Sequence, residues 1–308
     1  MAWVVPLCVL TQVVLAQTPQ PIAASQTNLE PAAVPAPSSE PVPSRPPTST
    51  SLWRGQWPTF SKVEGIATLV AGVGSGVLFM VKTPRDPRWE GGILFDDKLR
   101  SSLRLRAKNA RDKVEFYGDL PYYGAPLIPL IIDPLLVSWL GRGDTKTALN
   151  LEAIGLEAFS YAGLGSFIAT RAAGRERPSS TQCRRDHPAN ECSVDTESFY
   201  SGHTTIAAAS AGMVCANHRA MPLWGSQFAD VGACALATTG AVASGLSRMA
   251  SDRHYASDVI LGFGFGFGFG YAVPTLLHYA RDKNSEISLS IAPGSPCTGA
   301  CVKLAGSF

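Results

Sequence analysis

The stretch SRMASDRHYASD at residues 247–258 joins two long apolar segments and carries a dense set of polar side chains. Four of its positions follow the pattern S-R-x5-H-x3-D: Ser247, Arg248, His254 and Asp258. The i, i+4 spacing of His254 and Asp258 puts both side chains on one face if a helix has begun by His254. The pattern therefore predicts one helix that ends near Arg248 and a second that opens with His254 and Asp258.

Apolar segments of helical length fill most of the chain after residue 60. Their patterns predict helices over residues 62–81, 99–117, 121–140, 146–172, 203–218, 226–247 and 256–281. Strand patterns appear only at 286–292 and 301–305, which favour a small C-terminal hairpin through a turn that holds Cys297 and Cys301. The expected fold is all-α, a helical bundle with this hairpin at its C-terminal edge.

Residues 262–270 alternate glycine and phenylalanine, GFGFGFGFG. Strict alternation formally suggests a strand, but the tract lies within a long apolar stretch that starts directly after Asp258. On a helix, Gly262, Gly266 and Gly270 share one face, which allows close approach by a neighbouring helix. Each glycine costs a helix roughly 1 kcal/mol relative to alanine, so packing must offset this. We interpret the tract as a helix with a structural role.

The first fifty residues indicate export. Residues 1–16, MAWVVPLCVLTQVVLA, resemble a secretory signal peptide with Val14-x-Ala16 as its cleavage site, and an uncleaved anchor is the alternative. Residues 17–50 hold nine prolines among small and polar residues, which predicts a disordered tether. We assign residues 51–281 to a folded helical domain with a motif core at about 120–281, and residues 282–308 to a C-terminal tail.

Charge and cysteine content narrow the possible partners. A formal net charge of +2 gives no field that would recruit nucleic acid. The pairs Cys183/Cys192 and Cys297/Cys301 flank polar or small-residue segments and are candidate disulfides in an oxidising compartment. Cys215 and Cys234 lie in apolar helical stretches and are expected to be small core residues. No histidines match the cysteine spacings, so no metal site is expected.

Several of the predicted helices are long enough to span a membrane. If 62–81, 121–140 and 146–172 all span, the loop 173–202 with its cysteine pair faces the reducing cytoplasm. The basic stretch 82–113 would then satisfy the positive-inside rule, so the two indicators conflict. Two interpretations stay open: a bundle embedded in the inner membrane, and an exported bundle that only touches it. In both, the candidate site that carries residues 247–258 is expected to face the periplasm.

Two more motifs lie on loops upstream of residue 247. Ser201-Gly202-His203 precedes an apolar helix, whose first N–H groups can bind an anion. Arg177-Pro178 follows the helix that ends near Arg171, and arginine offers a planar donor fork for phosphate. Taken singly, these motifs are equally explained by helix capping and surface salt bridges. Together they predict a site that holds a phosphate and attacks it with histidine, without a metal or other cofactor.

These motifs resemble those of the type 2 phosphatidic acid phosphatase (PAP2) superfamily, which includes bacterial acid phosphatases and vanadium haloperoxidases. The family pattern is K-x6-R-P, then P-S-G-H, then S-R-x5-H-x3-D. The third motif matches in full here, and the second has Tyr200 in place of proline. The first has Thr170 in place of lysine, with Arg171 beside it as a candidate substitute.

The resemblance implies a role for each matching residue. His254 would attack phosphorus and form a phosphohistidine, Asp258 would orient it, and His203 would protonate the leaving alcohol. The phosphoryl oxygens would be bound by Arg177, Arg248, Ser201 and Gly202. The remaining histidines match no motif position and are expected to be surface or packing residues: His187, His218 and His278.

The expected activity is metal-independent hydrolysis of a phosphomonoester or diphosphate, carried by a lipid or another envelope substrate. A broad-specificity soluble periplasmic acid phosphatase is the first alternative. The resemblance also leaves open a vanadate-dependent haloperoxidase, although such chains are usually much longer, and a non-catalytic envelope protein, because Thr170 breaks the first motif. The expected partners are a phosphorylated lipid or small molecule and a membrane, and no nucleic acid.

Overall fold

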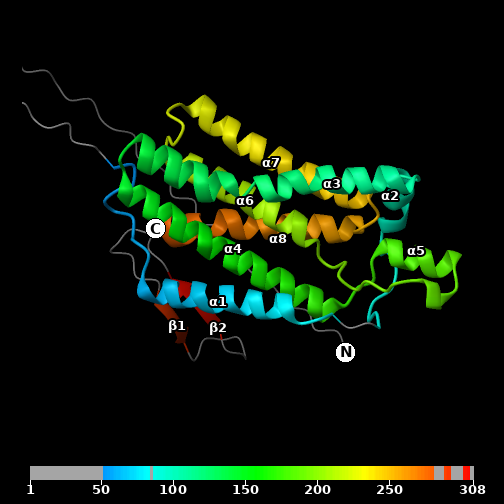
Figure 1. Ribbon diagram of the computed structural model, residues 1–308. Helices are drawn as coiled ribbons and strands as arrows, with labels where there is room; N and C mark the ends of the chain where they lie inside the picture. Colours follow the sequence, from blue (N-terminus) through cyan, green and yellow to red (C-terminus); the bar gives the residue numbers. More distant parts are fainter. Residues whose placement is uncertain (1–50, 84–85, 281–287, 293–300, 306–308) are drawn as a thin grey trace, which may run out of the picture. The chain divides into compact units, whose positions relative to one another are not determined.

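The computed structural model describes residues 51–83, 86–280, 288–292 and 301–305, which belong to one compact unit. The expected all-α fold is confirmed for the described residues up to 280, whereas the predicted signal peptide and tether lie outside the described residues. The elements, most of them labelled in Figure 1, are α1 (Lys62–Met80), α2 (Asp96–Leu103), α3 (Lys108–Gly124), the π-helix η1 (Ile128–Gly141), α4 (Thr145–Ala173), α5 (Pro178–Asp186), the 3₁₀ turn η2 (Ala189–Glu191), α6 (Gly202–Ala220), α7 (Gln227–Ala250), α8 (Ala256–Ala272), the π-helix η3 (Val273–Tyr279), β1 (Ser288–Ala292) and β2 (Cys301–Ala305).

The helix predicted over 99–117 is in fact two helices, α2 and α3, with a break that begins at Arg104. The Arg104 guanidinium binds the carboxylate of Asp252 at 2.7 Å, in the loop between α7 and α8. The N–H of Leu105 donates to the carbonyl oxygen of Ala250 at 3.0 Å. The break therefore ties the α2–α3 corner to the loop that carries the third motif.

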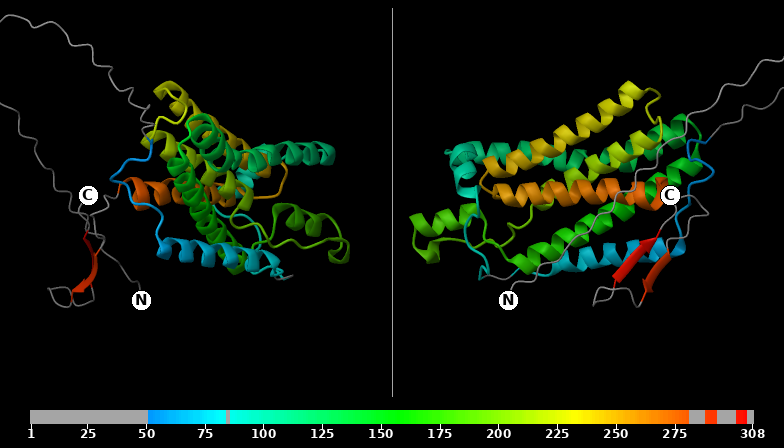
Figure 2. Two further views of the ribbon diagram at one scale, coloured as in Figure 1. Left: turned by 60° about the vertical axis from the view of Figure 1, so that its left-hand side comes forward. Right: turned by 180° about the vertical axis from the view of Figure 1, so that it is seen from behind.

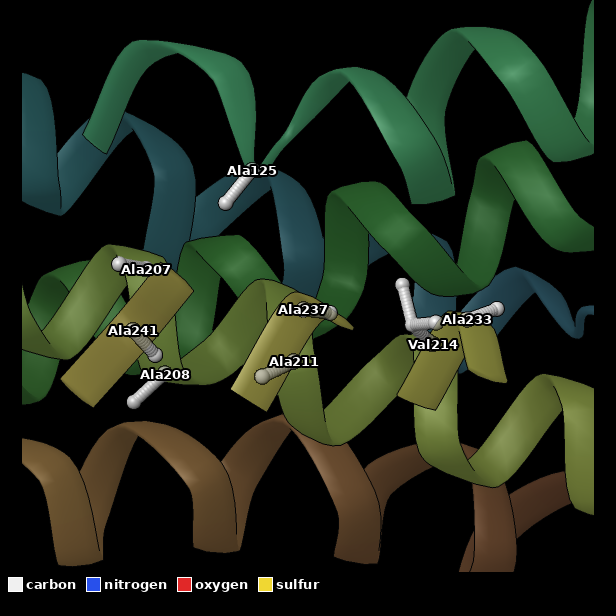
Figure 3. Close-up of a cluster of buried hydrophobic side chains, with 8 residues drawn as sticks. All are labelled: Ala125, Ala207, Ala208, Ala211, Val214, Ala233, Ala237 and Ala241. Carbon is white, nitrogen blue, oxygen red and sulfur yellow. The ribbon is translucent and has the colours of Figure 1, made fainter. Parts of the chain in front are cut away.

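Helix α6 is buried along nearly its whole length and packs between α7 and α8 (Figures 1 and 2). Its contact with α7 is made of small side chains, which Figure 3 shows between the two ribbons. They are Ala207, Ala208, Ala211 and Val214 of α6 and Ala233, Ala237 and Ala241 of α7, with Ala125 from the end of α3. Because these side chains are small, the axes of α6 and α7 can approach closely.

This close approach corrects one expectation about the cysteines. Cys215 of α6 and Cys234 of α7 form a disulfide, with Cα atoms 4.5 Å apart, and are not unpaired core residues. The sequence pattern of each helix does not say which faces meet, so this pair could not be read from spacing. Cys183 and Cys192 also form a disulfide, as the sequence indicated.

The glycine–phenylalanine tract is helical, as predicted, and makes up most of α8. Its buried glycines face the backbone of α6. A Cβ at Gly262 would lie 2.8 Å from the carbonyl oxygen of Ser201, and a Cβ at Gly266 would overlap the carbonyl oxygen of Thr205. Helices α6 and α8 are therefore in direct backbone contact, beginning at the end where the second and third motifs lie.

Replacing Gly266 with alanine is expected to destabilise the protein by about 1–3 kcal/mol, because the new methyl group overlaps backbone that cannot move aside alone. Gly264→Ala is the matched control, since its Cβ would have nothing within 4 Å. That control is expected to be neutral or to stabilise the helix by up to about 1 kcal/mol. Denaturant unfolding of both variants measures the difference, and equal stabilities would contradict the backbone contact.

Three described helical stretches are long and apolar enough to cross a membrane: Lys62–Met80, Gln227–Ala250 and Ala256–Tyr279. The bent pair α3 and η1 would make a fourth if it counts as one span. Large apolar side chains are exposed along α1 and α7, including Val63, Ile66, Leu69, Phe228 and Leu236. These surfaces are compatible with membrane association.

Strands β1 and β2 pair antiparallel, in a register that runs from Ser288 opposite Ala305 to Ala292 opposite Cys301. The residues that would connect them, including Cys297, lie outside the described residues. The C-terminal hairpin and its disulfide therefore stay predictions.

Candidate active site

The three motifs meet at a cavity of about 220 Å³ beside the N-terminal end of α6. Arg177 comes from the first motif, Gly202 and His203 from the second, and His254 from the third. The remaining lining residues are Thr170 and Arg171 of α4 with Gly163, Ser166 and Phe167, together with Phe79, Tyr122, Glu197, Tyr200 and Ile206. Segments far apart in the sequence thus form a single site.

His254 lies in the loop between α7 and α8 and is buried, with access to the cavity. Its Nδ1 atom is 2.7 Å from the carbonyl oxygen of Ser198. Because a carbonyl oxygen can only accept, Nδ1 carries the proton and Nε2 keeps its lone pair. Burial lowers the pKa of His254 well below its ordinary value, and the charge of Arg177 lowers that pKa further. The ring is therefore neutral at neutral pH, with Nε2 as its basic atom.

Asp258 does not contact the His254 ring, so the expected direct contact is corrected. One oxygen of its carboxylate binds the Arg175 guanidinium. The other accepts from the Ser198 hydroxyl at 2.6 Å and from the N–H of Tyr255 at 2.9 Å. The same Ser198 offers its carbonyl oxygen to His254. Asp258 is therefore linked to His254 through Ser198. The two side chains do not meet because His254 precedes α8, whereas the Asp258 carboxylate caps the first turn of that helix.

Arg175 belongs to no motif, yet it holds this arrangement together and is fully buried. Its guanidinium pairs with Asp258 of α8 and with Asp96 of α2. The rings of Trp89 and Tyr255 each lie with their centroids 4.1 Å from the Arg175 Cζ atom. Sequence reasoning missed Arg175, since its carboxylate partners are 79 and 83 positions away and no local signal separates it from other loop arginines.

His203 is the second residue of α6, and its ring centroid lies 4.3 Å from that of Tyr122. Its Nε2 atom is 3.4 Å from the Oδ1 atom of Asp119 on α3. Burial lowers the pKa of His203 to about 4, and the charge of Arg248 acts in the same direction. In the empty site His203 is therefore neutral at neutral pH.

Ser201 is the N-cap of α6. Its hydroxyl oxygen accepts hydrogen bonds from the N–H and the hydroxyl of Thr204, at 3.5 and 2.9 Å. Ser201 is fully buried and does not line the cavity, so its hydroxyl shapes the helix start instead of facing the cavity. Gly202 does line the cavity, in the first turn, where free N–H groups favour anions.

The two motif arginines are paired with carboxylates. The Nε atom of Arg177 lies 3.0 Å from Asp195. The Nη2 atom of Arg248 lies 2.6 Å from Asp119, and Arg248 is almost completely buried. Its Nε atom has no hydrogen-bond partner among the described residues. Arg177 lines the cavity, where a phosphate would compete with Asp195 for its guanidinium, whereas Arg248 is not among the lining residues.

Thr170 lines the cavity where the first motif calls for lysine, but its hydroxyl donates to the carbonyl oxygen of Ser166 at 2.9 Å. Arg171 lines the same cavity, and its Nη1 atom lies 3.7 Å from Glu197. A cation is thus present beside Thr170. That Arg171 replaces the lysine in function stays a prediction.

The histidines outside the motifs lie away from this cavity. His218 is buried between Asp133 and Asp230, and His278 is buried against Glu157, as expected for packing residues. His187 is exposed at the end of α5, also as expected. Within the part of the chain that the structure describes, no cluster of His, Cys, Asp or Glu is arranged to hold a metal ion.

These features define a helical bundle with a cavity of about 220 Å³ that is lined by two histidines and two arginines. The family model of the PAP2 superfamily matches residues 152–282, and this part of the chain belongs to that superfamily. The match begins within α4, after α3 and η1, and contains all three motifs and helices α5 to α8. No curated protein and no solved structure matches the chain significantly. This match supports a phosphatase-type function in general and, with it, the hydrolase class.

Proposed function

We propose that the protein is a metal-independent phosphatase that works through a phosphohistidine at His254. The observation that carries this proposal is the hydrogen bond from Nδ1 of His254 to the carbonyl oxygen of Ser198. It fixes the tautomer in which Nε2 has a free lone pair, and His254 reaches a cavity of about 220 Å³. A buried, neutral imidazole of fixed orientation is what a histidine nucleophile requires.

In the proposed reaction, Nε2 of His254 attacks phosphorus while the bond from phosphorus to the leaving oxygen breaks. Protonated His203 gives its proton to that oxygen and releases the alcohol. Neutral His203 then takes a proton from water, whose oxygen attacks the phosphohistidine and releases phosphate and free His254. Arg177, Arg171 and Arg248 supply donors for the non-bridging oxygens, together with the N–H groups at the start of α6.

The proposed substrate class is a phosphorylated lipid. Phe79, at the end of α1, lines the cavity and packs against Phe167, with ring centroids 5.9 Å apart. The apolar side chains exposed along α1 lead up to this point, including Val70, Val73 and Val77. An apolar surface that runs into a cavity lined by arginines and histidines suits an amphiphile better than a fully hydrated phosphate ester. Membrane association of the bundle follows from the same surfaces.

The proposed location is the cell envelope, with the active site facing the periplasm. The disulfide Cys183–Cys192 joins α5 to the segment between α5 and α6, upstream of the second motif. Disulfides persist in oxidising compartments, which supports a periplasmic position for this end of the bundle.

The experiment that tests the proposed function measures phosphate release by the detergent-purified protein from phosphatidate and from p-nitrophenyl phosphate, with EDTA present. Turnover of phosphatidate that EDTA does not affect is expected. Turnover of p-nitrophenyl phosphate alone would favour the broad-specificity acid phosphatase instead. No turnover of either substrate, or turnover that EDTA removes, would falsify the metal-independent mechanism.

A further inference from the structure

Helix α3 brings two carboxylates to the candidate active site, although it lies outside the segment that matches the family model. Glu115, Asp119 and Tyr122 follow one another at i, i+4 and i+7, so they share one face of α3. Gly118 allows this face to come close, because a Cβ there would overlap the Ser247 side chain on α7. The residue after Ser247 is Arg248, so α3 is held directly against the third motif.

Asp119 contacts both groups that the proposed reaction needs at this end of the cavity. Its Oδ1 atom is 2.6 Å from Nη2 of Arg248 and 3.4 Å from Nε2 of His203. Arg248 is further held by the carbonyl oxygen of Glu115 at 2.9 Å, and the Glu115 carboxylate binds Arg253 at 2.8 Å. The same oxygen of Asp119 therefore serves a phosphate-binding arginine and the acid histidine.

Arg248 and His203 need different partners before and after a phosphoryl group binds. In the empty site, Arg248 is buried and needs an anionic partner, which Asp119 supplies. When a phosphoryl group binds, its oxygens can take over the guanidinium. The acid histidine must then be protonated, and a neighbouring carboxylate stabilises the imidazolium form.

We propose that Asp119 is a positioning residue that exchanges partners during the reaction. It neutralises Arg248 while the site is empty, and it remains beside His203 as the counter-ion of the protonated acid once a phosphoryl group occupies Arg248. This inference rests on the proposed function, because it assigns Asp119 a role in the same site.

The charged groups around His203 decide whether removing the Asp119 charge raises or lowers the pKa of His203. Arg248, Arg177 and Arg253 lower the pKa of His203, whereas Asp119 raises it. Burial lowers the pKa of His203 to about 4, and removing the Asp119 charge is expected to lower it further. We expect the same direction in the substrate complex, because a carboxylate next to the imidazolium stabilises its charged form there too. A general acid is active below its pKa in the complex, so the alkaline limb of the kcat profile moves to lower pH.

The test is Asp119→Asn, with Asp112→Asn as the matched control on the same helix. Asp112 pairs only with exposed Lys108 at 3.4 Å among the described residues. For Asp119→Asn, the alkaline limb of kcat is expected to move down by about 0.5 to 1 pH unit. The affinity for inorganic phosphate, measured by titration calorimetry, is expected to rise roughly fivefold because Arg248 loses a competing anion. Asp119→Ala is expected to change both quantities in the same directions.

The opposite signs of these two effects separate partner exchange from a merely structural role. A substitution that only loosened the site would lower kcat and weaken phosphate binding together. Weaker phosphate binding in both Asp119 variants, or profiles equal to that of Asp112→Asn, would overturn the inference. If the unsubstituted protein binds phosphate but turns over no substrate, the proposed function fails while calorimetry still tests the exchange. If it neither binds nor turns over, both proposals fall.

Discussion

Alanine at His254 is expected to abolish phosphate release, with kcat lowered roughly 10⁴-fold or more. The reason is that Nε2 of His254 is the nucleophile in the proposed mechanism, and a neutral methyl group cannot form a phosphohistidine. The variant should also accumulate no labelled enzyme when a ³²P-labelled substrate is quenched in base, where phosphohistidine survives. Binding of inorganic phosphate should persist, because the arginines are untouched.

His187→Ala is the matched control for this substitution, since His187 is exposed at the end of α5 and does not line the cavity. It should keep full activity and full labelling. Normal turnover by His254→Ala, or labelling that persists in it, would refute the assignment of the nucleophile. Labelling that persists in His203→Ala, with slow turnover of a substrate that has a good leaving group, would agree with the roles of His203 as acid and then base, because such a substrate needs no acid to form the phosphohistidine.

Replacing Arg175 with methionine is expected to destabilise the protein by about 3–5 kcal/mol, the largest stability effect that we predict. The guanidinium is completely buried between two carboxylates, so its loss leaves Asp96 and Asp258 as unpaired charges in the interior. Activity should fall as well, because Asp258 holds Ser198, whose carbonyl oxygen orients His254. Urea unfolding in detergent measures the change in the free energy of unfolding.

Arg185→Met is the control, because Arg185 is exposed on α5. Its stability should change by less than about 0.5 kcal/mol. A double variant, Arg175→Met with Asp96→Asn, distinguishes the cost of an unpaired buried carboxylate from the cost of lost packing. It should recover part of the free energy of unfolding, because one unpaired charge is removed. Equal stabilities of Arg175→Met and Arg185→Met would show that the network contributes little.

The helical fold could be predicted from the sequence because its signal is local. Runs of apolar residues with helical spacing predicted α1, α4, α6 and α7 to within a few residues, and the helix predicted over 256–281 covers both α8 and η3. The break between α2 and α3 was missed because it depends on Arg104 reaching Asp252 from a distant part of the chain. The two π-helices, η1 and η3, were also missed. Each has a proline in its first two residues and continues an apolar run without a gap, so the sequence does not distinguish it from an α-helix.

The motif residues of the site could also be predicted, but their hydrogen bonds could not. Arg177, Gly202, His203 and His254 do meet at one cavity. The partner of His254 proved to be the main chain of Ser198, and a backbone carbonyl has no signature in a sequence. Arg175 and Asp119 were missed because an isolated arginine or aspartate acquires meaning only from its neighbours in space.

The backbone contact between α6 and α8 has a consequence for the evolution of new substrates. His203 lies at the start of α6, and His254 lies just before α8. The absence of a side chain at Gly262 lets the two helix N-termini approach, and this sets the distance between them. Phe79 of α1 and Phe167 of α4 also line the cavity, and they lie outside this contact. Under the proposed function, substitutions at these two positions are expected to change the preferred substrate while the spacing between His203 and His254 stays constant.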